Sequence, residues 1–216
     1  MKKKLKRWAI IFTFLALVAN IISLFLVFFY APTEVTMGEI QKIFYYHVPF
    51  AIVCYFLLFI SFVFSWLFLL RRKFHYDFWA HSGAEVGMIF IVCVLVSGTI
   101  WGRAAWGKWW VWEPRLSTFL IMFVIYFSYF LFRTFGREEP KTPKIAAVFR
   151  ILGFIDVPIV NRAIVWWGSI VHPTKVSLEP EMKLVFLFSF FSVLVLALSL
   201  LLWRVYIEER IVSNDD

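Results

Sequence analysis

The chain has 216 residues, of which 62% are hydrophobic, 21% aromatic and 17% charged, and its mean hydropathy is +0.81. A soluble domain is roughly half apolar and about a quarter charged, and a chain of this length cannot hide such a surplus in a core. The composition therefore disfavours a soluble enzyme, a nucleic-acid-binding protein and a disordered module, although 22 Lys and Arg against 14 Asp and Glu give a net charge of +8. It predicts an integral membrane protein.

Five segments are apolar enough over the ~20 residues that a helix needs to cross the hydrocarbon core of a bilayer. They lie at 8–30, 48–70, 83–100, 116–135 and 184–203. The first follows the basic residues 1–7, but its apolar stretch is longer than the ~7–15 residues of a signal peptide and no A-x-A-like site follows. We expect an uncleaved anchor.

A sixth segment, 145–167, is a weaker candidate because it contains Arg150, Asp156, Pro158 and Arg162. We expect it to cross as well. The predicted fold class is all-α: a polytopic integral membrane protein with six transmembrane helices and short outer loops, forming a single domain.

The Lys and Arg residues are distributed unevenly between the two sides of these six spans. Fourteen fall on the side of the N-terminus, six on the opposite side, and two within 145–167. Because cytoplasmic loops carry the excess of positive charge, both termini are expected in the cytosol. If 145–167 lay along the membrane surface, every later residue would change sides, so Lys175 and Lys183 would exchange with Arg204 and Arg210. The number of positive charges on each side would stay the same. The charge distribution alone therefore leaves this crossing open.

The segment 101–117, which we call the tryptophan loop, separates the third and fourth spans on the outer side. Five of the eleven Trp fall within twelve of its residues, and Trp166 and Trp167 are expected at the same face. An aromatic belt spreads tryptophans over both interfaces and several helices, so it does not explain this clustering. The loop is therefore a candidate binding site.

The chemistry of the loop indicates a large, flat and apolar ligand with anionic edges. Packed indoles form a rigid apolar wall, and Arg is suited to carboxylate or phosphate recognition. Haem combines a planar ring with two propionates, whereas a quinone lacks the anions and a phospholipid headgroup lacks the plane. The candidate ring-lining residues are Trp106, Trp109, Trp110 and Trp112, and the candidate propionate partners are Arg103, Lys108 and Arg115.

Two of the four His are placed to ligate haem iron, for which His is a common axial ligand. His47 lies where the second span enters from outside, and His172 lies just past the sixth segment, directly before Pro173. We expect both at the outer face as axial ligands. His75 and His81 belong to the cytosolic side and are predicted to be solvated or interfacial.

The remaining polar groups give weaker signals. Cys54 and Cys93 lie in separate spans, where a redox pair is possible but burial as small apolar residues is more common. No Cys-x-x-Cys-His occurs, so the chain is not itself a c-type cytochrome. Glu85 stays open between a functional and an interfacial role, and no sequence motif of a nucleophile or general acid is present.

Three sequence blocks resemble the haem exporter protein C family of cytochrome c maturation. They are Phe44-Tyr-Tyr-His-Val-Pro, the run Trp106-Gly-Lys-Trp-Trp-Val-Trp-Glu-Pro-Arg-Leu-Ser, and Val157-Pro-Ile-Val followed by Trp166, Trp167 and His172. The middle block is similar to the family's WWD motif, W-G-x-W-W-x-W-D-x-R-L-T. Glu113 replaces its Asp and Ser117 its Thr, which leaves the role of Glu113, as a contact to haem or to a partner, to be tested.

The resemblance implies six spans in a bacterial inner membrane, with the tryptophan loop and both external His on the periplasmic side. It implies haem b as a transported ligand, held by the site residues named above. It also implies delivery to a periplasmic haem chaperone, the E component, beside an ABC transporter of A and B components with a small D subunit, in contact with membrane lipid and without nucleic acid.

The expected role is thus a haem-handling assembly factor and not an enzyme. The alternative is a cytochrome c synthase-type haem lyase, which attaches haem directly to apocytochrome c and carries the same tryptophan motif. Such proteins are larger, and the short outer loops here leave little room for an apocytochrome segment. A quinone-linked cytochrome b is disfavoured because no His lies mid-membrane.

Overall fold

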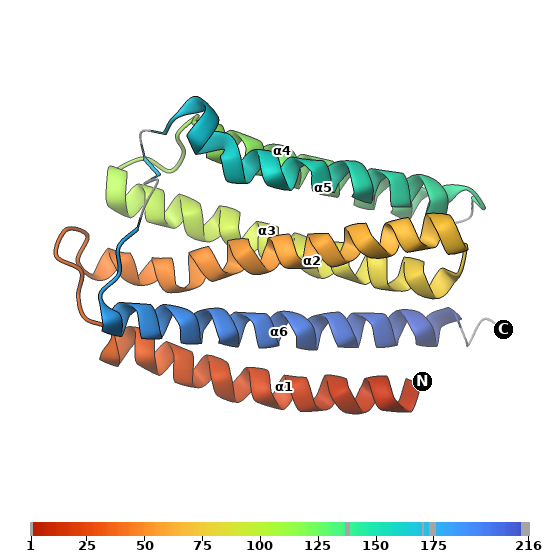
Figure 1. The fold of residues 1–216 in the computed structure, drawn as a ribbon, viewed down its shortest axis with the longest axis horizontal. Coiled ribbons are helices and arrows are strands. Elements are labelled where there is room, and N and C mark those ends of the chain that lie inside the picture. Colours follow the sequence, from red (N-terminus) through yellow and green to blue (C-terminus); the bar gives the residue numbers. More distant parts are fainter. Residues whose placement is uncertain (1, 137–138, 170, 173–175, 213–216) are drawn as a thin grey trace. The chain divides into compact units, whose positions relative to one another are not determined.

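The structure, a computed structural model, describes residues 2–136, 139–169, 171–172 and 176–212. Arg137 and Lys175, which entered the charge distribution, and Pro173 lie outside the described residues. The described chain consists of six long helices joined by short connections, and no β-strand occurs among these residues (Figure 1). The helices are α1 Lys2–Phe25, α2 Phe44–Arg71, α3 Phe74–Trp106, α4 Pro114–Phe135, α5 Thr142–Trp167 and α6 Pro180–Val212.

Five segments of the described chain have the length and hydropathy of membrane spans. They are Lys3–Tyr30, Glu39–Arg71, Phe74–Trp106, Pro114–Phe135 and Pro180–Ile211. Two of them include short helical extensions, a π-helix at Leu26–Tyr30 and a 3-10 helix at Glu39–Ile43. The predicted class of an all-α polytopic membrane protein is confirmed.

The chain divides into two compact units. The first contains Met1–Cys54, Phe90–Trp110 and Ser177–Asp216, and the second contains Tyr55–Ile89 and Val111–Val176. The single-domain organisation expected from the sequence stays a prediction.

In the first unit, α1 and α6 lie side by side along a seam of small polar side chains (Figure 1). The hydroxyls of Thr13 and Ser199 are 2.8 Å apart, and Ser23 donates to Ser189 over 3.0 Å. The order of these pairs shows that the two helices are antiparallel. Small and polar residues of this kind are typical of helix contacts in membranes, where apolar burial does not distinguish a neighbour from lipid.

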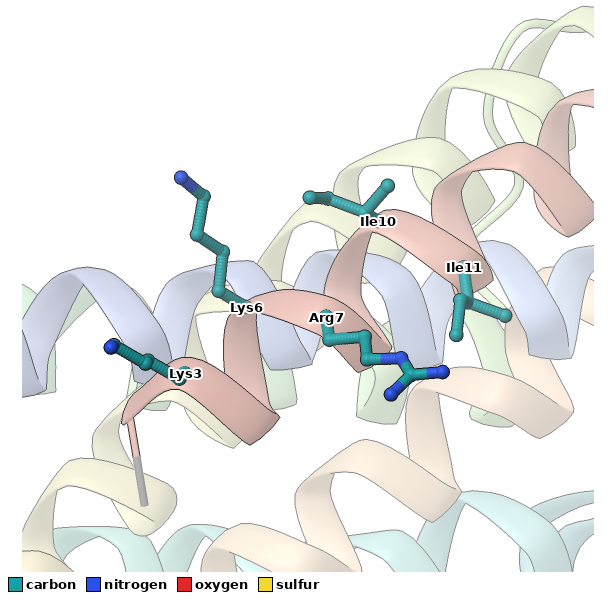
Figure 2. A pocket seen from close by; sticks show the side chains of 5 residues that line it. All are labelled: Lys3, Lys6, Arg7, Ile10 and Ile11. Carbon is teal, nitrogen blue, oxygen red and sulfur yellow. The ribbon is translucent and has the colours of Figure 1, made fainter.

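The start of α1 carries a basic groove. Lys3, Lys6, Arg7, Ile10 and Ile11 line an open cavity of about 460 Å³, and the three cationic residues are exposed (Figure 2). Because α1 and α6 are antiparallel, this groove lies at the same end of the unit as the end of α6. The cavity is at the opposite end of α1 from the start of α2.

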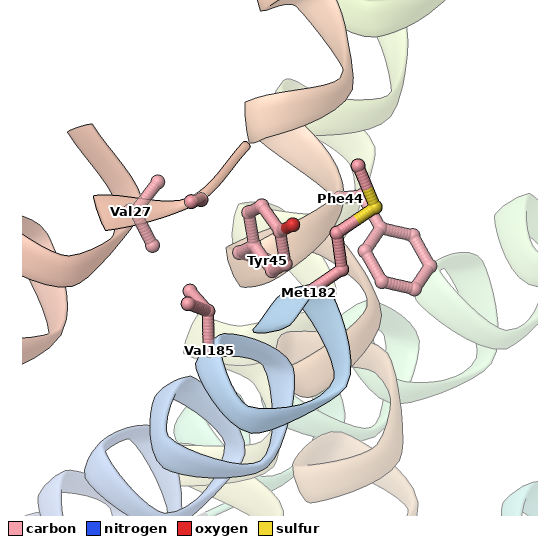
Figure 3. Close-up of a cluster of buried hydrophobic side chains, with 6 residues drawn as sticks. Val27, Phe44, Tyr45, Met182 and Val185 are labelled. Atoms are coloured by element: carbon pink, nitrogen blue, oxygen red, sulfur yellow. The ribbon is translucent and has the colours of Figure 1, made fainter. Parts of the chain in front are cut away.

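At that opposite end, a hydrophobic cluster fixes the start of α2 (Figure 3). Val27, Phe44, Tyr45, Met182 and Val185 are buried there against one another, together with Ala31. The cluster ties the first turn of α2 to the π-helix that follows α1 and to the beginning of α6. It thereby determines where the next residues of α2, including the candidate ligand His47, lie in the unit.

In the second unit, α4 and α5 form an antiparallel pair (Figure 1). Phe132 stacks on Phe149 with ring centroids 5.5 Å apart, and Gly153 lies directly against the Tyr126 ring, where a Cβ would come within 3.1 Å. The antiparallel course brings the start of α4 and the end of α5 to the same end of the unit.

The weak sixth segment is therefore a continuous helix, α5, although it is not among the five segments with the hydropathy of a span. Its 26 residues measure about 39 Å at 1.5 Å per residue, longer than the ~30 Å hydrocarbon core. Its charges lower the mean hydropathy, but two of them face inward, since Arg150 is fully buried and Asp156 is 7% exposed, whereas Arg162 is exposed. Hydropathy underestimates such a helix because it does not distinguish an inward charge from a lipid-facing one.

Arg150 is held by a buried polar network at the far end of the second unit from the start of α4. Its guanidinium donates to Asp77 over 2.7 Å, to Ser65 over 2.8 Å and to the Tyr129 hydroxyl over 2.8 Å. Asp77 also accepts a bidentate pair of hydrogen bonds from Arg133, the shorter of 2.7 Å. The network links four helices and compensates the cost of burying these charges.

Candidate functional site

His47 is held in the first unit by a hydroxyl group of α3. Its Nδ1 lies 2.9 Å from Oγ of Ser97, and that hydroxyl donates its own proton to the carbonyl of Cys93 over 2.6 Å. Because Ser97 has one proton and has donated it, it accepts from His47, so Nδ1 carries the hydrogen and Nε2 the lone pair. Nε2 is the nitrogen that a metal would bind.

Two further residues of α3 fix the orientation of the His47 ring. Trp101 meets it edge to face, with ring centroids 5.5 Å apart, and Gly98 allows it to approach closely, since a Cβ there would lie 3.1 Å from Cε1 of His47. Trp101 follows Gly98 by three residues and Ser97 by four, so the three residues lie within one stripe of the helix that faces His47. Ser97 and Gly98 were not predicted from the sequence, because their role depends on the rotation of α3 relative to the start of α2.

The tryptophan loop begins where α3 ends at a glycine in the left-handed conformation. Gly107 has φ of +73°, and its N–H donates to the carbonyl of Arg103 over 3.1 Å, which is a common way of ending a helix. The Arg103 guanidinium donates back to the carbonyl of Gly107. Gly102 lies against the carbonyl of Lys108, where a Cβ would come within 3.2 Å, so the loop folds back on the last turn of α3.

Two indoles of the loop are largely exposed. Trp109 in the first unit is 61% exposed and Trp112 in the second is 77% exposed, whereas Trp106 and Trp110 are half-buried. Exposed apolar side chains of this size mark a surface that meets lipid, a ligand or a partner. That the loop presents these indoles to a ligand stays a prediction.

Glu113 joins the start of α4 to the loop after α5. It is the residue before Pro114, with extended backbone and φ of −125°, and its side chain makes no cap to its own helix. Instead one carboxylate oxygen pairs with Nδ1 of His172 and the other accepts from the Ser169 hydroxyl. Ser169 in turn accepts from the backbone N–H groups of His172 and Val171, over 2.8 and 3.2 Å.

This constellation determines the state of the His172 imidazole. An ionised carboxylate only accepts hydrogen bonds, so Nδ1 carries the proton and Nε2 the lone pair. Burial lowers the pKa of His172 below its usual 6.5, and Arg115 lowers it further, against the opposing effect of Glu113. The ring is therefore neutral at neutral pH, as iron coordination requires.

The structure thus places the predicted residues in two local arrangements. In the second unit Glu113, His172 and Arg115 interact, and Trp112 is next in sequence. In the first unit Arg103 contacts the helix end and Lys108 is exposed beside Trp109 in the chain. Joint ligation of one haem by His47 and His172 stays a prediction. Ser169 was not predicted from the sequence, although a Ser hydroxyl that bonds the backbone a few residues on is a common turn element.

The weaker candidates lie elsewhere. Cys54 and Cys93 are not joined by a disulfide. His81 extends the buried network of the second unit, with Nδ1 2.8 Å from the Tyr129 hydroxyl and Nε2 3.7 Å from Glu85. Glu85 therefore belongs to that network and not to the arrangement around His172.

A model of the family described as Heme exporter protein C matches residues 1–214. The chain belongs to the haem exporter protein C family. This confirms the family that the sequence resembles, while the correspondence of the tryptophan-rich block to the WWD motif stays a prediction.

Curated relatives agree with this family assignment. The chain is 28% identical over 216 residues to Heme exporter protein C of Rhodobacter capsulatus, covering 96% of this chain and 88% of that protein. It is 26% identical over 180 residues to Heme exporter protein C of Escherichia coli, covering 82% and 74%. It is also 31% identical over 155 residues to a cytochrome c biosynthesis ccmC-like mitochondrial protein of Marchantia polymorpha, covering 72% of this chain and 65% of that relative.

The names of these relatives support a role in haem handling during cytochrome c biogenesis. They describe a transport or assembly factor and not a classical enzyme. Together with the apolar helices, the bacterial relatives indicate a multi-pass inner-membrane protein.

Proposed function

We propose that this protein holds haem b at the periplasmic face of the inner membrane and delivers it to a periplasmic haem chaperone. His47 and His172 bind the iron through Nε2. The indoles of Trp106, Trp109, Trp110 and Trp112 contact the ring, and Arg103, Lys108 and Arg115 contact the propionates. The protein transfers haem without a nucleophile or general acid of its own.

The observation that carries this proposal is the pairing of His172 with Glu113. A buried carboxylate on Nδ1 is the usual outer partner of a metal-binding His, because it fixes the tautomer and raises the basicity of the ligand nitrogen. The Ser97 hydroxyl supports the same tautomer at His47. Nδ1 is thus hydrogen-bonded in both His residues that the sequence assigns to iron, which supports the same tautomer in each.

The proposed topology places both termini in the cytosol, six spans in the membrane and both ligands outside. The antiparallel packing of α5 on α4 supports the sixth crossing, which charge alone left open. The basic groove at the start of α1 would then face anionic lipid headgroups on the cytosolic side. The partners in this proposal are the chaperone, the A and B components of an ABC transporter and the small D subunit.

Co-expression with each acceptor tests the proposal against the haem lyase alternative. The protein is produced with its partners and either the periplasmic chaperone or apocytochrome c, and covalent haem on the acceptor is measured after denaturing electrophoresis. Delivery predicts covalent haem on the chaperone, and its loss in the His172→Ala variant but not in His75→Ala. Covalent haem on apocytochrome c in the absence of the chaperone would establish the lyase instead.

The topology has an independent test at Ser177, an exposed residue of the loop between α5 and α6. A cysteine is introduced there in a background with Cys54 and Cys93 replaced by Ser, and a membrane-impermeant thiol reagent is added to intact spheroplasts. Labelling from the periplasm is expected. Labelling only after the membrane is opened would place His172 in the cytosol and contradict the site.

A further inference from the structure

The basic groove at the start of α1 is built by one face of a single helix (Figure 2). Its lining residues are spaced by three and four positions, which places them in one stripe of an α-helix: Lys3, Lys6, Arg7, Ile10 and Ile11. The first three are cationic and the last two are apolar. The groove therefore changes from basic to apolar along the direction in which α1 runs.

The apolar part of the groove continues along α1 as an exposed apolar stripe. Phe14, Leu17 and Ile21 follow Ile10 at spacings that keep them on the same face of the helix, and all three side chains are exposed. The contacts with α6, such as that of Ser23, lie on a different face of α1. The groove and the stripe thus form one continuous surface that the described chain leaves uncovered.

The positive charge of the groove is not compensated within the described chain. Among the residues that the structure describes, none of the three cations pairs with a carboxylate. The first turn of α1 contains no acidic residue, although the start of a helix has a partial positive charge that favours acidic and disfavours basic side chains. At the same end of the unit, by contrast, Arg204 of α6 pairs with Glu208 over 2.6 Å.

An amphiphile with an anionic head is complementary to both parts of this surface. Phosphates pair well with Lys and Arg, and acyl chains pack on exposed apolar side chains. A phospholipid of the cytosolic leaflet has its head at the membrane surface and its chains toward the hydrocarbon core, which is the order of the two parts along α1. A lipid with two phosphates compensates three cations better than a lipid with one, and basic pockets on the cytoplasmic side of membrane helices bind such heads.

We propose that the basic groove and the apolar stripe of α1 bind one molecule of a phospholipid with two phosphates, of the cardiolipin type. The phosphates contact Lys3, Lys6 and Arg7, and the acyl chains lie along the stripe. The lipid thereby holds the start of α1 at the surface of the cytosolic leaflet. The inference rests on the cytosolic N-terminus of the proposed function, but not on haem binding.

Native mass spectrometry of the full-length protein in detergent tests the preference for two phosphates. The unaltered protein is titrated with cardiolipin and, separately, with phosphatidylglycerol of the same acyl chains. We expect one cardiolipin to bind more tightly than phosphatidylglycerol by a factor on the order of 100, because two linked phosphates bind as one ligand. Equal dissociation constants for the two lipids would overturn the inference, and this comparison requires no variant.

Substitution of the cations tests the location of the site. The groove variant is the triple substitution Lys3→Gln, Lys6→Gln and Arg7→Gln. It should weaken cardiolipin binding about 100-fold, since each Lys or Arg near an anionic lipid surface contributes a factor of about five. The control variant removes the same number of exposed charges at the end of α2 and in its connection to α3: Arg71→Gln, Arg72→Gln and Lys73→Gln.

The control variant should bind cardiolipin like the unaltered protein. Unchanged binding in the groove variant, or an equal loss in the control variant, would overturn the inference. Thiol labelling at position 177, repeated on the groove variant, shows whether its topology is retained. The haem spectrum of the groove variant should be unchanged. The lipid titration requires no haem, so a failure of haem binding in the unaltered protein would refute the proposed function and leave this test unaffected.

Discussion

The close contact between Gly98 and His47 makes Gly98→Ala a specific test of the site. The added Cβ would lie 3.1 Å from Cε1 and 3.7 Å from Nδ1 of the ring. Carbon atoms in contact are ordinarily about 3.5–4.0 Å apart, so the ring must withdraw by about 0.4 Å. The ring is confined by the hydrogen bond to Ser97 and by the Trp101 ring. Its movement therefore either strains that hydrogen bond or displaces the Trp101 side chain.

The displacement should weaken ligation by His47 without weakening the helix. A binding constellation has to be held within about 0.5 Å of its working geometry, so a shift of about 0.4 Å is expected to reduce haem affinity several-fold and to add a high-spin fraction. Alanine favours a helix by about 1 kcal/mol over glycine, so the stability of α3 before haem loading should not fall. The two effects have opposite signs, which separates damage to the site from damage to the fold.

Absorption spectra and haem titration of the purified protein measure the first effect, and thermal unfolding without haem measures the second. Thr99→Ala is the matched control, since it changes the next residue of α3 and removes only a hydrogen bond to Val96 within the helix. If Gly98→Ala leaves both the spectrum and the affinity unchanged, His47 does not bind iron in the position described. If it lowers stability instead, the contact is part of the fold and the reasoning from ligand displacement fails.

Three further predictions concern the network, the loop and the ligand. Arg150→Ala should lower the free energy of unfolding by about 3–5 kcal/mol, because it leaves the buried Asp77 with one partner fewer. Adding Asp77→Asn to this variant should recover part of the loss. A free energy of unfolding for Arg150→Ala within about 1 kcal/mol of the unaltered protein, measured by thermal unfolding, would contradict this. Gly107→Ala should cost about 1–2 kcal/mol at its positive φ and weaken haem-dependent quenching of tryptophan fluorescence, an effect that an unchanged titration would disprove. By NMR of the haem-free protein, His172 should have a pKa below 6.5. Its neutral form therefore contributes stability that is present above pH 6.5 and is lost as the pH falls below that value. Glu113→Gln should lower the pKa of His172 further, and a rise would show that Glu113 does not act on His172 as a negative charge.

The sequence located the spans well and their ends poorly. The predicted segment 83–100 corresponds to the helix α3 at Phe74–Trp106, and 184–203 corresponds to α6 at Pro180–Val212. Hydropathy marks the part of a helix that lies in hydrocarbon, whereas the polar turns at each end continue on backbone hydrogen bonds that composition does not reveal. The segment 145–167 was doubtful for a related reason, because Arg150 is paired with Asp77, 73 residues away in sequence.

In the candidate site, too, the sequence predicts some residues but not the contacts between them. The sequence could indicate His47, His172 and the tryptophan loop, because residue type and clustering carry that signal. It could not indicate that Glu113 turns away from its own helix, or that Ser97 faces His47. Those contacts depend on the rotation of helices and on the path of loops between them, which only the folded chain determines.

The central claim is that one haem is ligated by both His47 and His172, and electron paramagnetic resonance of the ferric, haem-loaded protein tests it most directly. The unaltered protein and His75→Ala should both give a low-spin signal of bis-histidine haem. His47→Ala and His172→Ala should each convert it to a high-spin signal, and the double variant should lose the haem on purification. A low-spin bis-histidine signal that persists in either single variant would contradict the account.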